Sequence, residues 1–203
     1  MHESKGNTKR FRYGGLVLVL EDDEGIAKNI SQLFETKWRC TTEIAESKEK
    51  AEELVNDPKK KFKLGIIDTM VPGTECDLRE IRNLEKQLKE VETVIMKVHN
   101  AKDDDAAKRE QLPGARHRRS VILDQISKLI DRKGGIKFVR TLRGTGRSKN
   151  RNIPVLYLTA LGNDEIVSEG LEASGVKSGW LRKPAPGEVI LARAKELFAE
   201  KNY

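Results

Sequence analysis

The chain has 203 residues, of which 37% are hydrophobic and 35% charged, and its formal net charge is +7. This length accommodates one domain of ordinary size plus a large addition. The longest purely aliphatic run, residues 16–20, is far too short to cross a membrane, and the N-terminal segment lacks the apolar stretch of a signal peptide. Two cysteines, Cys40 and Cys76, are too few for a disulfide framework. We therefore expect a cytoplasmic protein that does not act at a membrane.

Short aliphatic strands alternate with amphipathic helices along the chain. The runs GLVLVL, LGII and PVLYL are continuously hydrophobic, which is typical of strands buried on both faces of a parallel sheet. We therefore predict an open α/β sandwich with a parallel five-stranded sheet. The expected strands cover 15–20, 38–44, 64–67, 154–158 and 179–183, and the expected helices between and after them cover 24–36, 47–55, 164–173 and 186–198.

Polar side chains follow these strands at their carboxyl ends. Glu21 and Asp22 follow the first strand, Asp68 the third, Thr159 the fourth and Lys183 the fifth. Because the carboxyl ends of parallel strands meet at one edge, the carboxylates would repel one another and favour a bound cation. An all-oxygen site suits a hard ion such as Mg²⁺. The lysine and the threonine hydroxyl beside it would suit a phosphoryl group.

Four segments carry a family resemblance. LVLVLEDDEGI, GIIDTMVPG, IPVLYLTALGNDE and GWLRKP resemble, in order and in strand context, the signature segments of the receiver domain of bacterial two-component response regulators. The resemblance covers roughly residues 15–73 and 134–200. It implies a flavodoxin-like (βα)5 three-layer sandwich. It also implies a phosphoprotein that is not an enzyme beyond taking phosphate from a donor and losing it again by autodephosphorylation.

The resemblance also implies roles for individual residues. Asp68 would be the phospho-acceptor, and Thr159 and Lys183 would contact the phosphoryl oxygens. An aspartate can act as such a nucleophile and form an acyl phosphate. Haloacid-dehalogenase-like phosphatases, which also use an aspartate, need a second aspartate where this chain has Met70, so we exclude that class. The implied Mg²⁺ ligands are Glu21, Asp22, Asp68 and the backbone carbonyl of Met70.

Further positions would govern switching and signal lifetime. Thr159 and Trp180 correspond to the threonine and aromatic residue that switch together in receivers, and the Lys183–Pro184 bond falls where the family has a cis peptide. Met70 and Leu161 occupy the two positions that tune dephosphorylation in the family. Both are apolar and cannot hold a hydrolytic water, so we expect slow autodephosphorylation.

A long insertion separates the two parts of the resemblance. The family-like pattern resumes only at 134 with GGIKFVRTLR, so we assign 1–14 to a tail, 15–73 and 134–203 to the receiver domain and 74–133 to the insertion. We predict a helical hairpin there, with a second helix over 115–132 and a chain reversal at Pro113-Gly114. Its first helix carries a heptad seam typical of coiled coils, formed by Ile81, Leu84, Leu88, Val91, Ile95 and Val98.

Two functions remain open at this point. In the first, a sensor histidine kinase or phosphotransfer protein phosphorylates Asp68, and the protein signals through protein–protein contacts without an output domain of its own. In the second, the chain is a scaffold or adaptor that binds a partner through the hairpin without phosphorylation. The heptad seam would either close the hairpin on itself or pair with a second copy or a partner helix. Nucleic-acid binding through the basic segment 136–152 is a weaker third reading.

Overall fold

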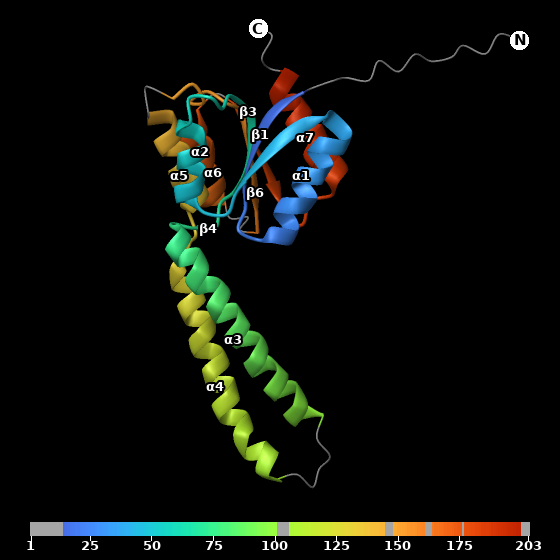
Figure 1. The fold of residues 1–203 in the computed structure, drawn as a ribbon, viewed down its shortest axis with the longest axis vertical. Coiled ribbons are helices and arrows are strands. Elements are labelled where there is room, and N and C mark those ends of the chain that lie inside the picture. The colour runs from blue at the N-terminus through green and yellow to red at the C-terminus, as the bar shows by residue number, and fades with distance from the viewer. Residues whose placement is uncertain (1–13, 101–105, 145–147, 161–163, 176, 200–203) are drawn as a thin grey trace, which may run out of the picture.

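A five-stranded sheet forms the centre of the protein (Figure 1). The computed structural model describes residues 14–100, 106–144, 148–160, 164–175 and 177–199. The strands stand in the order β2-β1-β3-β6-β7, and each neighbouring pair is parallel. This is the strand order of flavodoxin-like folds, so the expected fold class is confirmed. In chain order the strands are β1 (Gly15–Leu20), β2 (Cys40–Ala45), β3 (Phe62–Asp68), β6 (Val155–Thr159) and β7 (Ser178–Arg182).

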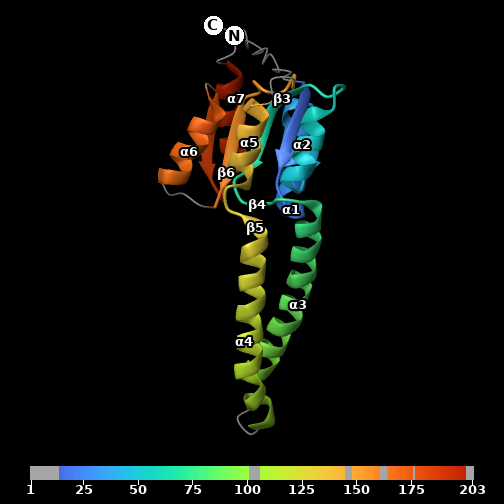
Figure 2. The same cartoon turned by 90° about the vertical axis from the view of Figure 1, so that its left-hand side faces the viewer.

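Helices cover both faces of the sheet (Figures 1 and 2). One face carries α1 (Glu24–Trp38) and α7 (Gly187–Ala199). The other carries α2 (Lys48–Asn56), α5 (Gly134–Gly144) and α6 (Asp164–Ser174). The sheet is therefore the middle layer of a three-layer sandwich.

Strand β1 shows why the aliphatic runs are continuous. Val17 and Val19 pack into the core on the α1 and α7 side, whereas Leu18 and Leu20 pack into the core on the α2 and α5 side. All four side chains have no exposed surface. Successive side chains of a strand point to opposite faces, and here both faces are covered, so every position favours an aliphatic residue.

Helices α1 and α2 each begin at a side-chain N-cap. Asp23 accepts a hydrogen bond from the Ile26 N–H at 2.8 Å at the start of α1, and Ser47 caps α2 in the same way. The expected start of the second strand is wrong, because β2 begins at Cys40 rather than at 38. Trp38 stays in α1 because its ring packs edge-on against Phe34, with ring centroids 5.2 Å apart.

Two long antiparallel helices project from the carboxyl edge of the sheet (Figure 2). They are α3 (Glu75–His99) and α4 (Ala106–Leu129). A small antiparallel pair of strands, β4 (Val71–Pro72) and β5 (Ile130–Asp131), closes the base of this hairpin. Within the described ranges, no helix combines the length and the apolar character that a membrane crossing requires.

The hairpin differs from expectation at two points. Pro113 lies inside α4, which already begins at Ala106, so the expected chain reversal at Pro113-Gly114 is wrong. The helix persists past the proline because Ala115 and Ile122 are buried, which repays one lost backbone hydrogen bond. The second helix also ends at Leu129 rather than at 132, because Ile130 pairs with Pro72 in the small sheet. The aspartates at 103–105, a residue type that favours helix starts, lie outside the described residues.

The heptad seam of α3 is only partly closed by α4. Ile81 and Leu84, near the sheet, and Val98, near the tip, are at most 7% exposed. The three seam residues between them are half-buried: Leu88, Val91 and Ile95. The two helices therefore bury the ends of the seam better than its middle.

Candidate functional site

Three carboxylates meet at the carboxyl edge of the sheet. Glu21 and Asp22 follow β1, and Asp68 is the last residue of β3, the neighbouring strand. One oxygen from each lies within 4.8 Å of the others. Glu21 is 2% exposed and Asp68 is 7% exposed, whereas Asp22 is half-buried. Parallel pairing of β1 with β3 brings these residues together, although 46 positions separate Asp68 from Asp22 in the chain.

Lys183 joins this cluster from the end of β7. Its amine donates hydrogen bonds to Glu21 Oε2 at 2.5 Å and to Asp68 Oδ2 at 2.6 Å. The backbone carbonyl of Thr159 accepts a hydrogen bond from the Lys183 backbone N–H at 2.7 Å, which fixes the backbone of Lys183 relative to β6. The peptide bond between Lys183 and Pro184 is cis. Asp68 also accepts a hydrogen bond at Oδ1 from the Met70 N–H at 3.0 Å.

The cluster holds more negative charge than the lysine balances. Burial, followed by the charge of Asp68, raises the pKa of Glu21 to about 7. Burial likewise raises the pKa of Asp22 to about 6. Burial alone would lower the pKa of Lys183, but the neighbouring Asp68 and Glu21 carboxylates raise it above its ordinary value. A divalent cation would relieve this excess charge, and the all-oxygen donor set fits Mg²⁺ better than a softer metal.

A second polar pair lies beside the carboxylates. Thr159, the last residue of β6, has no exposed surface, and its hydroxyl shares a 2.6 Å hydrogen bond with the hydroxyl of Thr69. Thr69 was not among the residues expected from the sequence. The available signal was its place directly after Asp68, where a hydroxyl residue follows the last residue of a buried strand.

Trp180 lies on β7, further from the carboxylates. Its half-buried ring packs against Tyr157 of β6, with ring centroids 5.0 Å apart and the planes tilted by 43°. The Tyr157 hydroxyl accepts a hydrogen bond from Ser174 in α6. A Cβ added at Gly170 would lie 2.6 Å from the Trp180 ring, so this glycine lets α6 approach the tryptophan closely. Of the remaining expected positions, Met70 is half-buried and Leu161 lies outside the described residues.

The α3 helix of the hairpin stands next to the acidic edge. A cavity of about 370 Å³ separates the loop after β1 from the first turns of α3. Its walls include Asp22 and Asp23 on one side and Arg82 and Glu85 on the other. Arg82 forms an ion pair with Glu46 at 2.8 Å, which ties α3 to the turn between β2 and α2. A partner that approaches Asp68 from this side would meet the hairpin.

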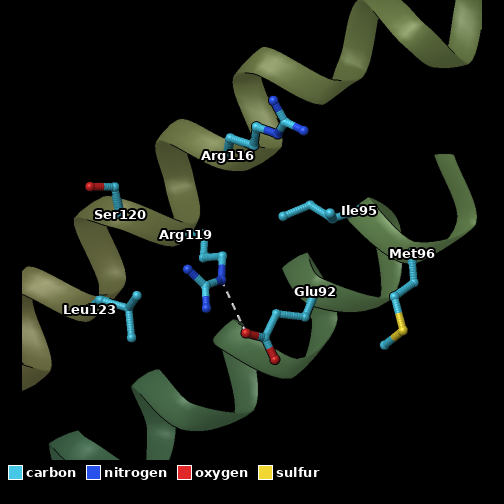
Figure 3. Close-up of a pocket in the computed structure, with 7 residues that line it drawn as sticks. All are labelled: Glu92, Ile95, Met96, Arg116, Arg119, Ser120 and Leu123. Carbon is cyan, nitrogen blue, oxygen red and sulfur yellow. Dashed lines mark hydrogen bonds and ion pairs between the residues drawn. The ribbon is translucent and has the colours of Figure 1, made fainter. Parts of the chain in front are cut away.

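A second hollow lies between the two helices, nearer the tip of the hairpin (Figure 3). Ile95 and Leu123 line it with Met96, which is 61% exposed. Arg116 and Arg119 line it from α4, and Arg119 forms an ion pair with Glu92 of α3 at 3.1 Å. This hollow therefore combines exposed apolar side chains with charges of both signs.

Comparison with known proteins identifies the fold. No protein-family profile matches the chain, and no curated protein matches it by sequence. Among solved structures it resembles the receiver domain of a Francisella response regulator, with a TM-score of 0.55, 21% identity and coverage of 93% of this chain and 99% of that one.

Two further solved structures show the same likeness. A CheY-like receiver domain protein from Methanospirillum hungatei has a TM-score of 0.55 and 14% identity over 92% of this chain and 94% of its own. The receiver domain of a histidine kinase from Syntrophus aciditrophicus has a TM-score of 0.54 and 18% identity over 93% of this chain and 92% of its own. The chain thus has the fold of response-regulator receiver domains, interrupted by a helical hairpin.

Proposed function

We propose that the protein is a phospho-accepting receiver of a two-component phosphorelay and that Asp68 takes the phosphoryl group. One observation carries this proposal: the Asp68 carboxylate lies beside two further carboxylates and accepts a hydrogen bond from the amine of Lys183, at the carboxyl edge of a receiver-type sheet. This arrangement combines a nucleophile with a cation-binding donor set and a fixed positive charge. Phosphoryl transfer needs these three parts and little other chemistry from the protein.

The proposed reaction follows from the positions of these groups. An oxygen of Asp68 attacks the phosphorus of the donor, a new P–O bond forms, and the bond from phosphorus to the leaving group breaks with its electron pair. Lys183 already contacts Asp68 Oδ2 and would neutralise charge on the transferred group. The Thr159 hydroxyl would donate a hydrogen bond to a phosphoryl oxygen. Mg²⁺, when bound, would supply charge neutralisation, and the residues that would hold it are Glu21, Asp22, Asp68 and the Met70 carbonyl.

The phosphodonor would be a sensor histidine kinase or a phosphotransfer protein. Both cysteines are free thiols, Cys40 buried and Cys76 exposed, which fits a reducing compartment and supports the cytoplasm as the site of action. Because α3 stands beside the acidic edge, such a donor would contact both the receiver and the base of the hairpin.

A direct phosphorylation assay tests this proposal. Purified protein is incubated with Mg²⁺ and acetyl phosphate, and the intact mass is measured. Wild type should gain one phosphoryl group, and EDTA should prevent the gain. Asp68→Asn should gain none, whereas Asp124→Asn, which changes an exposed carboxylate on α4, should behave as wild type. A phosphoryl group on Asp68→Asn would place the acceptor elsewhere and contradict the proposal.

A second candidate function rests on the hollow of the hairpin in Figure 3. Its exposed apolar side chains favour a protein partner, and its mixed charges favour a self-complementary surface. We propose a second copy of the chain as that partner, since two hairpins would form a four-helix bundle and cover the half-buried seam. Light scattering over a range of concentrations tests this. Wild type should dimerise and Met96→Glu with Leu123→Glu should not, and a wild type that stays monomeric would contradict self-association.

A further inference from the structure

The hydrogen bond between Thr69 and Thr159 joins two hydroxyls that no solvent reaches. Both residues have no exposed surface, and the two oxygens are 2.6 Å apart. They meet because Asp68 pairs with Leu158 in the register of β3 and β6, which sets the next residues of the two strands level with each other. Thr69 therefore follows the proposed acceptor in the chain and shares a hydrogen bond with the proposed phosphoryl-binding hydroxyl.

Both threonines are held by their backbones. The Thr69 carbonyl accepts the N–H of Gly135 at 3.2 Å at the start of α5, and the Thr159 carbonyl accepts the N–H of Lys183 at 2.7 Å. These contacts tie Thr69 to the helix that follows the hairpin and Thr159 to the lysine of the site. A change in their hydroxyl contacts therefore requires a side-chain rotation about Cα–Cβ rather than a shift of either strand.

A contact of the Thr159 hydroxyl with a phosphoryl group would compete with its contact to Thr69. Either hydroxyl can be the donor of the 2.6 Å hydrogen bond, and where Thr159 donates, its single proton cannot serve both contacts. If Thr159 rotates toward a phosphoryl group on Asp68, its oxygen leaves the Thr69 hydroxyl, which has no exposed surface through which it could bind water instead. A buried polar group that loses its partner is unfavourable. The Thr69 hydroxyl thus stabilises the arrangement seen here against the phosphoryl-bound one.

We propose that Thr69 is a positioning residue, whose hydroxyl holds Thr159 in the resting arrangement and so sets the threshold for switching. This inference rests on the proposed phospho-accepting function and deepens it. Thr69 does not touch the phosphoryl group itself. It acts through Thr159. Its hydroxyl favours the population in which Thr159 contacts Thr69 over the population in which Thr159 contacts the phosphoryl group.

The test compares the affinity of the variants for beryllofluoride in Mg²⁺, measured by isothermal titration. Thr69→Val keeps the shape but removes the hydroxyl, so it should bind beryllofluoride about tenfold more tightly than wild type. Thr69→Ser restores a hydroxyl and should return the affinity to near the wild-type value. Thr141→Val, which removes a hydroxyl from the exposed face of α5, is the matched control and should leave the affinity unchanged.

A double-mutant cycle separates positioning from general stability. In a Thr159→Val background, Thr69→Val should no longer change the affinity, because the hydroxyl it acts on is gone. Unchanged or weaker binding by Thr69→Val, or equal effects of the valine and serine variants, overturns the inference. A wild type that binds no beryllofluoride overturns the proposed function as well, so the two failures are distinguishable. Thermal unfolding of each variant verifies that it is folded.

Discussion

Removal of the Lys183 amine should destabilise the protein in a strongly pH-dependent way. The amine contacts Glu21 Oε2 at 2.5 Å and Asp68 Oδ2 at 2.6 Å, and the three side chains are 17%, 3% and 9% exposed. Breaking a buried ion pair by removing one partner costs about 3–5 kcal/mol, because the other charges stay buried without compensation. We therefore expect Lys183→Met to lower the free energy of unfolding by about 3 kcal/mol at pH 8.5 in EDTA.

The sign of the pH dependence follows from the carboxylates. Glu21 has a pKa of about 7 in the folded protein, raised from 4.5 by burial and by Asp68. Between these values the folded state binds more protons than the unfolded state, so stability falls as pH rises through this window. At pH 5 the Glu21 carboxyl is protonated and neutral, so it no longer needs the positive charge of Lys183 beside it. The part of the Lys183→Met loss that comes from Glu21 should therefore disappear at pH 5, while the part that comes from the contact with Asp68 remains, so the loss should be clearly smaller at pH 5 than at pH 8.5.

Urea denaturation in EDTA at pH 5 and pH 8.5 measures this difference. Arg182→Met removes an exposed cation from the adjacent position on β7 and should change stability by less than about 0.5 kcal/mol at both pH values. Glu21→Gln should raise stability at pH 8.5, by up to roughly 3 kcal/mol, because it removes a buried charge whose pKa is raised to about 7. An equal loss at both pH values for Lys183→Met would refute the electrostatic account of the site.

Three further outcomes are expected. Gly135→Ala should destabilise the protein by about 3 kcal/mol or more in thermal unfolding, because the added Cβ would overlap the Asp68 carbonyl oxygen; Gly144→Ala, where a Cβ meets nothing within 4 Å, should not. In a Trp38→Phe background, beryllofluoride should change the fluorescence of Trp180, and an unchanged spectrum with bound ligand would show that this aromatic does not switch. Met70→Asn should accelerate the decay of phosphorylated protein by placing a polar group near the phosphorylated Asp68, and a decay rate equal to wild type would contradict the shielding role of Met70.

The sequence alone determined the layers of the fold and most of the candidate site. The aliphatic runs identified strands buried on both faces, and parallel strands place their carboxyl ends at one edge by geometry alone. Glu21, Asp22, Asp68 and Lys183 could therefore be placed together before any coordinates. The heptad spacing from Ile81 to Val98 likewise identified α3, because a period of 3.5 is a local property of the chain.

Only the tertiary structure decided the contacts that depend on partners distant in sequence. Local rules predict a break at Pro113, but packing of α4 along α3 outweighs one missing backbone hydrogen bond. The pairing of Ile130 with Pro72 likewise depends on a strand formed far earlier in the chain. The hydrogen bond between Thr69 and Thr159 spans 90 positions and arises from the register of β3 and β6, which no local pattern encodes. Register and packing decide which side chains meet at the edge of the sheet. The residues of a segment itself decide whether that segment forms a strand.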